Sequence, residues 1–210
     1  MFKQLRLIGI IGIIIATLGA CVPQSTAVSA PTDEPARVEP ADAPVPPPRL
    51  SDEELKHFNE YIPSLRGASL IKLAEIRNQN EAYIQFYTNY NELKEANPDT
   101  PISETEFNSY FPAIDAVHKT IMDISVRLLH EIPAIRKITL AVPFKNQLYG
   151  IDANKRSIEM YLKASFKKMH DEPGQKHWKE LLKKLFTTKE RDKFAQRFIR
   201  PCQPSPLQLQ

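Results

Sequence analysis

The chain has 210 residues, a formal net charge of +3 and 42% hydrophobic residues, enough for one domain of common size with its own core. Only six glycines occur. All-β folds and nucleotide-binding α/β folds usually use more glycine in their turns and loops, so we predict an all-α fold, a small helical bundle.

Residues 1–20 have the pattern of an export signal. Lys3 and Arg6 precede an uncharged apolar stretch over residues 7–20. The stretch is short for a membrane span, which needs about 20 residues. It ends in Leu18-Gly19-Ala20-Cys21, which resembles the lipobox of bacterial lipoproteins, where small residues precede an obligatory cysteine.

This resemblance implies that the Cys21 thiol is lipidated and that residues 1–20 are removed as a signal peptide. The mature chain would then be attached to a membrane by fatty acyl chains such as palmitate. Val22 stands where an aspartate tends to retain lipoproteins in the inner membrane, so we expect the periplasmic side of the outer membrane. The alternatives are an ordinary secretory signal peptide and an uncleaved membrane helix.

Residues 21–50 carry the lipidated cysteine and a proline-rich linker. The linker includes Pro46-Pro47-Pro48 and has no apolar periodicity, so we expect an extended spacer between the membrane and the domain. The helical domain is predicted over residues 51–200, followed by a disordered tail over 201–210. In that tail Cys202 is an inert exposed thiol or, alternatively, forms an intermolecular disulfide.

The first half of the domain is predicted to hold three helices. Ser51 and Glu54 form a capping box that begins a short helix ending near Tyr61. A longer helical segment, whole or in two parts, is expected over residues 69–96. Ser103-Glu104-Thr105-Glu106 is a second capping box.

The second capping box begins the strongest helix of the chain. Apolar residues recur at spacings of three and four from Phe107 to Leu128. Pro112 falls early in this run and can kink or restart the helix.

The second half is predicted to be a connector and three short helices. Residues 132–150 form the connector, in which Ile138–Val142 could be a strand but shows no convincing partner strand. Asp152 is predicted to cap the first helix, Pro173-Gly174 to separate it from the second, and Thr187 to begin the last. The last helix includes Ile199 and ends before Pro201.

A group of aromatic residues is a candidate partner groove. Tyr83, Phe86, Tyr87 and Tyr90 would lie along one side of the helix predicted over residues 69–96. This face is either a helix–helix core or a groove that receives a helix of a partner protein.

Charge is divided unevenly along the chain. Residues 31–131 carry 18 acidic and 9 basic residues, a net of −9, while residues 155–200 carry 6 acidic and 14 basic residues, a net of +8. Within the basic part, Lys176, Lys179, Lys183 and Lys184 are candidates for binding an anionic surface such as lipid head groups. The alternatives are docking of the basic half onto the acidic half and simple solvation.

The motifs of common catalytic sites are absent from the sequence. There is no glycine-rich phosphate loop, no Gly-x-Ser-x-Gly, no His-Glu-x-x-His and no Cys-x-x-Cys. His170, Asp171, Glu172 and His177 are the densest group of metal-ligand types, but their spacing matches no familiar zinc pattern, so we interpret them as a polar loop. We predict no catalytic residue, no metal and no cofactor.

These features predict a non-enzymatic envelope lipoprotein. Its role would be binding or assembly, as an accessory of a machine such as a secretion or conjugation apparatus, with an envelope protein as its partner. The alternative is a protein that binds anionic lipid or cell wall through its basic C-terminal helices. Nucleic acid is not expected as a partner in this compartment.

Overall fold

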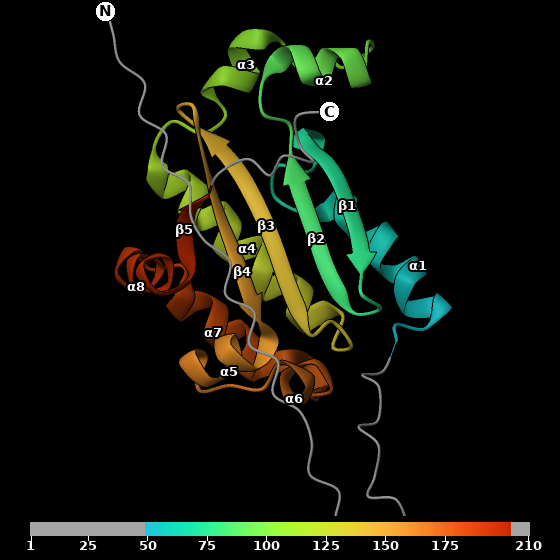
Figure 1. The fold of residues 1–210 in the computed structure, drawn as a ribbon. Helices are drawn as coiled ribbons and strands as arrows, with labels where there is room; N and C mark the ends of the chain where they lie inside the picture. Colours follow the sequence, from blue (N-terminus) through green and yellow to red (C-terminus); the bar gives the residue numbers. More distant parts are fainter. Residues whose placement is uncertain (1–48, 203–210) are drawn as a thin grey trace, which may run out of the picture. The chain divides into compact units, whose positions relative to one another are not determined.

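The computed structural model describes residues 49–202, which form a mixed sheet with helices (Figure 1). The signal segment, Cys21, most of the proline-rich linker and residues 203–210 lie outside the described residues. The elements are α1 (Asp52–Tyr61), β1 (Ile71–Arg77), β2 (Glu81–Phe86), α2 (Tyr90–Ala96), α3 (Glu104–Ser109), α4 (Ile114–Glu131), β3 (Lys137–Phe144), β4 (Gln147–Asn154), α5 (Lys155–Leu162), α6 (Phe166–His170), α7 (Lys176–Leu185), α8 (Thr188–Phe198) and β5 (Ile199–Cys202), with 3-10 turns at Ile62–Ser64, Ala68–Leu70 and Pro173–Gln175.

The five strands form one sheet in the order β1-β2-β3-β4-β5. β2 and β3 run parallel, and the other neighbouring pairs run antiparallel. The parallel pair is joined by a crossover through α2, α3 and α4 (Figure 1). The prediction of an all-α bundle is therefore wrong, and the fold is α/β.

The predicted helix over residues 69–96 is largely a β-hairpin. β1 and β2 pair from Ile71↔Phe86 to Arg77↔Glu81, and only α2 is helical within this range. The hairpin loop uses Asn78 and Gln79 at positive φ values of 45° and 74°, a backbone region that asparagine tolerates better than most residues. Alternate residues of β2, among them Ala82 and Ile84, are fully buried, as expected for one face of a strand.

The segment interpreted as a connector contains β3. Ile138, Leu140 and Val142 are buried in strict alternation. β3 pairs with β2 on one side, where Glu81 lies opposite Lys137, and with β4 on the other. The parallel partner is far away in the sequence, so local inspection of residues 132–150 did not reveal it.

The predicted strong helix is confirmed as α4, which supplies much of the core. Val117, Ile121, Ile124 and Leu128 are completely buried, and α4 packs against β3. The interruption near Pro112 is also confirmed, because α3 ends at Ser109 and α4 begins at Ile114.

Local signals at helix ends were predicted well, with two exceptions. The capping boxes of Ser51 and Ser103 are both formed, and Thr187 caps α8 by accepting a hydrogen bond from the Glu190 backbone. Asp152 caps no helix and lies in β4. Ile199 leaves the last helix and begins β5, where it pairs with Ile151.

Gly150 allows β3, β4 and β5 to pack closely. A Cβ atom at this position would lie 2.6 Å from the Leu140 carbonyl oxygen and 3.3 Å from Cys202 Sγ. The first distance is too short for any side chain, so the position requires glycine. None of the helices within residues 49–202 is both long and apolar enough to cross a membrane.

Candidate functional site

A groove of about 1060 Å³ lies at the end of the sheet where β2 stops. Its walls come from the segment that follows β2, from the tip of the β3–β4 hairpin and from the link between α3 and α4. Five aromatic side chains line it: Phe86, Tyr87, Phe107, Phe111 and Phe144. Amides and hydroxyls add polar groups, and Lys145 is the only charged residue among the residues of the range 49–202 that line it.

Ring contacts connect these walls to one another. Phe86, the last residue of β2, lies 6.2 Å from Phe111 between ring centroids. Phe107 of α3 packs edge-on against Tyr90 of α2, also at 6.2 Å. The two short helices are therefore fixed to the end of the sheet by rings, which bury large apolar areas and tolerate edge-to-face geometry.

A charged hydrogen-bond network fixes the wall at Thr88. Glu92 Oε2 accepts hydrogen bonds from the Thr88 backbone N–H at 2.6 Å and from its hydroxyl at 2.8 Å. Lys72 of β1 donates to the same carboxylate. Burial raises the pKa of Glu92, but the bonds from Lys72 and Thr88 outweigh it and lower the pKa overall, so the carboxylate is ionised at neutral pH.

The groove also contains a free stretch of strand edge. Pairing between β2 and β3 ends at Gln85 and Ala141, whereas β3 continues to Phe144. Within residues 49–202, no strand pairs with residues 142–144 on the side that faced β2. The tight turn at Lys145 and Asn146, both at positive φ, returns the chain into β4 beside this edge.

Cys202 lines the groove at the end of β5. It lies opposite Leu148 and is half-buried, so the prediction of an exposed thiol is wrong. Burial raises the pKa of the thiol, which keeps it protonated and therefore weakly nucleophilic near neutral pH.

Two of the four predicted aromatic residues line the groove. Phe86 and Tyr87 do so, while Tyr90 lies behind them against Phe107. Tyr83 points to the opposite face of β2, where the Arg77 guanidinium lies 3.3 Å from its ring centroid. Spacing of three and four does not align side chains in a strand, because alternate residues face opposite sides.

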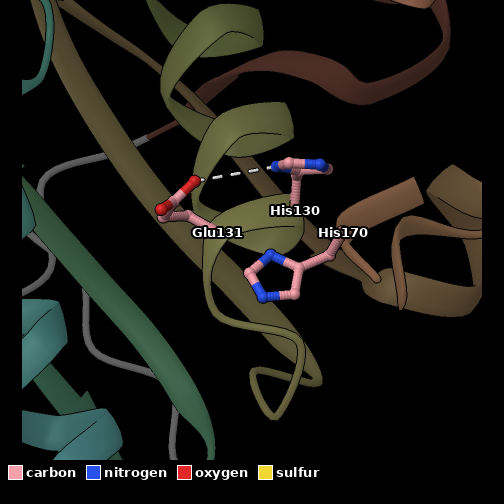
Figure 2. A group of neighbouring side chains, drawn as sticks. All are labelled: His130, Glu131 and His170. Atoms are coloured by element: carbon pink, nitrogen blue, oxygen red, sulfur yellow. Dashed lines mark ion pairs between the residues drawn. The ribbon is translucent and has the colours of Figure 1, made fainter. Parts of the chain in front are cut away.

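A second cluster lies where α4 ends beside α6, shown in Figure 2. His130 Nδ1 is 3.7 Å from Glu131 Oε2, and the His170 ring centroid is 5.5 Å from that of His130. Burial lowers the pKa of His130, and the Glu131 carboxylate acts in the opposite direction. Trp178 stacks on His130 at 3.8 Å between centroids with only 4° between the planes.

Sequence reasoning missed this cluster and grouped His170 with other residues. Glu172 accepts a hydrogen bond from His177 Nδ1 at 2.6 Å, and Asp171 pairs with Lys167 at 2.7 Å. These pairs form a polar surface, as interpreted, but His170 faces His130 instead. The two histidines are 40 residues apart, and no sequence spacing indicates that they meet.

The four candidate lysines of α7 are exposed to solvent. Lys176, Lys179, Lys183 and Lys184 face outward, while Trp178 and Leu185 on the opposite side of the helix are buried. Trp178 is therefore part of the core and does not reach the surface. Among the ion pairs within residues 49–202, only Arg191–Asp115 joins the basic part to the acidic part, so most of these charges face solvent.

Comparison with known proteins gave no match to any family model, curated protein or solved structure.

Proposed function

We propose that this chain is a lipid-anchored envelope protein whose folded domain binds an extended apolar segment of another envelope protein. The groove at the end of β2 is the observation that carries the proposal. Its volume and its five aromatic side chains suit the burial of several apolar side chains of a partner.

The β3 edge inside the groove offers an extended partner only part of a strand ladder. Residues 142–144 continue β3 beyond the last pair with β2, but Pro143 in this stretch has no N–H and can only accept a hydrogen bond. Added strands gain affinity from backbone hydrogen bonds and specificity from pockets for alternate side chains. We therefore propose that the affinity for an extended segment comes mainly from its apolar side chains, which enter between the aromatic rings.

The single charge in the groove indicates the chemistry of the partner segment. Lys145 lies at the tip of the hairpin, with its Nζ 5.2 Å from the centroid of the Phe144 ring. A carboxylate on the partner can pair with this lysine while apolar side chains enter between the aromatic rings. Accessory proteins of a secretion or conjugation apparatus need such binding sites, and we place this chain among them.

The first test replaces residues with a photo-crosslinking benzoylphenylalanine in intact bacteria. At Tyr87 in the groove, we expect a discrete covalent adduct with one envelope protein. At Met160, which is 64% exposed on α5, we expect none. Equal adducts from both positions would show that capture is not specific to the groove.

The second test measures binding of a fluorescent octapeptide with alternating apolar and polar residues and a free carboxylate. Asn108→Glu places a carboxylate in the groove, where it repels the peptide's carboxylate and is expected to weaken binding. Thr105→Glu adds the same charge to α3 outside the groove lining and is the matched control. Equal affinities of the two variants would contradict the proposal.

A shortened chain tests whether the protein's own C-terminus occupies the groove. Residues 203–210 continue from Cys202, which lines the groove. A chain that ends at Cys202 is therefore compared with the full chain. If only the shortened chain binds the peptide, the groove accommodates the protein's own C-terminus and the proposed partner is wrong.

A second candidate function is binding to an anionic membrane surface through α7, because all four of its candidate lysines are exposed. Replacing Lys179, Lys183 and Lys184 with Gln is expected to weaken binding to phosphatidylglycerol vesicles. The effect should diminish with salt, since the Debye length falls to about 8 Å at physiological ionic strength. Substituting Lys56, Lys94 and Lys119 instead is the control, and equal loss in both variants would mean only a general charge effect.

A further inference from the structure

The corner between α4, α6 and α7 contains histidine nitrogens that make no hydrogen bond. His130 is 1% exposed, and within residues 49–202 neither of its ring nitrogens makes a hydrogen bond of normal length and angle, although Nδ1 lies 3.7 Å from Glu131 Oε2 and the Met169 backbone is nearby. The Nδ1 atom of His170 is also buried without a partner. Buried polar atoms are almost always paired, because an unpaired group loses its hydration without compensation. Such a group of atoms in one place therefore suggests a bound species that pairs with them.

The three side chains of this corner converge on a common point. Figure 2 shows the Glu131 carboxylate beside His130, with the His170 ring next to both. One donor atom from each of the three residues lies within 4.8 Å of the others, and His130 Nδ1 is 3.7 Å from Glu131 Oε2.

We propose that His130, Glu131 and His170 form a binding site for one zinc ion that connects the end of α4 to α6. Two imidazoles and one carboxylate are a common set of three protein ligands for Zn²⁺, with water in the fourth position. This donor set is less suited to Mg²⁺ or Ca²⁺, which prefer oxygen ligands.

Small movements would bring these donors to bonding distance. Zinc bonds of about 2.0–2.1 Å place tetrahedral ligand atoms about 3.3 Å apart. The His130 and Glu131 donors, at 3.7 Å, are already close to that separation, so the adjustment falls mainly on His170, whose donor atom lies within 4.8 Å of theirs. His170 is the last residue of the five-residue helix α6 and is only partly buried, so its side chain can rotate.

Neighbouring side chains fix the orientation of two of the three proposed ligands. Trp178 stacks flat against His130 and fixes the plane of its ring. His57 of α1 has Nε2 3.4 Å from Glu131 Oε1, the carboxylate oxygen that faces away from His130. Such outer contacts orient metal ligands, so His57 and Trp178 are positioning residues.

The test uses the full chain in detergent, freed of metal with a chelator and titrated with ZnCl₂. Trp178 is the single tryptophan of the sequence, so its fluorescence reports on the ring that it stacks against. We expect a fluorescence change that is complete at one equivalent of zinc, and a rise in Tm over the same range. MgCl₂ should produce neither. A fluorescence signal without saturation near one equivalent would overturn the proposal.

Three variants assign the site to these residues. His170→Ala and Glu131→Gln remove direct ligands, so the zinc affinity of each should fall by more than the 10–100-fold that removal of an outer contact typically costs. The zinc affinity of His57→Ala should fall within that 10–100-fold range. His177→Ala removes an exposed histidine of α7 that pairs with Glu172, and it should bind zinc as the wild type does.

Cobalt provides an independent check. Co²⁺ in the site should give visible absorption bands of the intensity typical of four- or five-coordinate cobalt, and His170→Ala should remove them. Circular dichroism verifies that each variant is folded. If His177→Ala lowers zinc affinity as much as His170→Ala, or if neither changes it, the site is not the one proposed. The result does not depend on whether the groove binds a peptide.

Discussion

The two ends of the sheet satisfy their polar groups in opposite ways. At the groove, Thr88 and Lys72 satisfy the Glu92 carboxylate, while the aromatic rings line an open space. At the corner of α4 and α6, the ring nitrogens of His130 are buried without a hydrogen bond, although Nδ1 is 3.7 Å from Glu131 Oε2. The first region lacks an apolar ligand and the second lacks a polar one, which suggests a peptide at one end and a metal ion at the other.

The largest expected effect concerns the scaffold beneath the groove. Gly150→Ala places a Cβ atom 2.6 Å from the Leu140 carbonyl oxygen, a backbone atom that cannot move without displacing β3. Overpacking of this kind costs about 3 kcal/mol of unfolding free energy. Chemical denaturation monitored by circular dichroism measures it.

Gly174→Ala is the matched control for this prediction. A Cβ atom at Gly174 meets nothing within 4 Å, so only its φ of 75° opposes the substitution. That strain costs about 1–2 kcal/mol. Equal losses in the two variants would show that the contact with β3 is not what makes Gly150 necessary.

The next prediction concerns a buried cation that has its partner. Arg191 of α8 is 7% exposed and donates to Asp115 of α4 through Nε at 2.6 Å and Nη2 at 2.9 Å. Asp115→Asn leaves this guanidinium without an anion. We expect a loss of about 2 kcal/mol, less than for a fully buried pair because Asp115 is half-exposed. Asp123→Asn, whose partner Arg127 is more exposed, should cost less in the same urea titration.

No loss of stability, or a small gain, is expected at His130, whose buried ring nitrogens make no hydrogen bond within residues 49–202. His130→Leu keeps similar volume against Trp178 and removes two unpaired nitrogens, so the metal-free variant should be as stable as the wild type or up to about 1 kcal/mol more stable. Zinc should no longer raise its Tm. A loss of stability above about 2 kcal/mol in metal-free buffer would show that His130 makes stabilising polar contacts.

The smallest effect is a pH dependence at the groove. The pKa of Glu92 is lowered in the folded state by Lys72 and Thr88, so its contribution is present at neutral pH and disappears as the pH falls through the lowered value. Glu92→Gln should therefore be less stable than the wild type near pH 7, by less than about 1 kcal/mol because the carboxylate is partly exposed.

The difference in stability between Glu92→Gln and the wild type should shrink in acid. Measurements of Tm for both proteins between pH 3 and pH 7 would show this. Glu95→Gln changes an exposed carboxylate of the same helix and serves as the control. A stability difference that grows in acid would contradict a lowered pKa of Glu92 in the folded state.

Features encoded by neighbouring residues were readable from the sequence. Ser51 and Ser103 each stand three residues before a glutamate, and a capping box requires nothing else. The apolar period of α4 was readable for the same reason, since one face of that helix is buried along most of its length.

Both hairpins of the sheet are local, but the segments of β1 and β2 were read as helical and the segment of β3 as a connector. The pair that joins the two hairpins is distant in the sequence. Ala82 pairs with Ile138 across a crossover of three helices, and this pairing decides that both segments are strands. The aromatic residues from Tyr83 to Tyr90 fit helical spacing as well as a strand followed by a helix. Two of the four residues predicted for the groove, Phe86 and Tyr87, line it for this reason, while the histidine corner had no signal in the sequence at all.

The two edge strands of the sheet affect how readily copies of the protein associate when they are crowded on a membrane surface. β1 carries Lys72, Glu75 and Arg77 along one edge, and β5 on the other is four residues long and includes Pro201, which has no N–H to donate. A protein attached to a membrane, as proposed here, meets copies of itself in two dimensions at high local concentration. Charges and proline at the edges discourage such copies from joining their sheets into fibres. The recessed stretch of β3 also contains a proline, Pro143, so this edge too offers a second copy few donors for pairing.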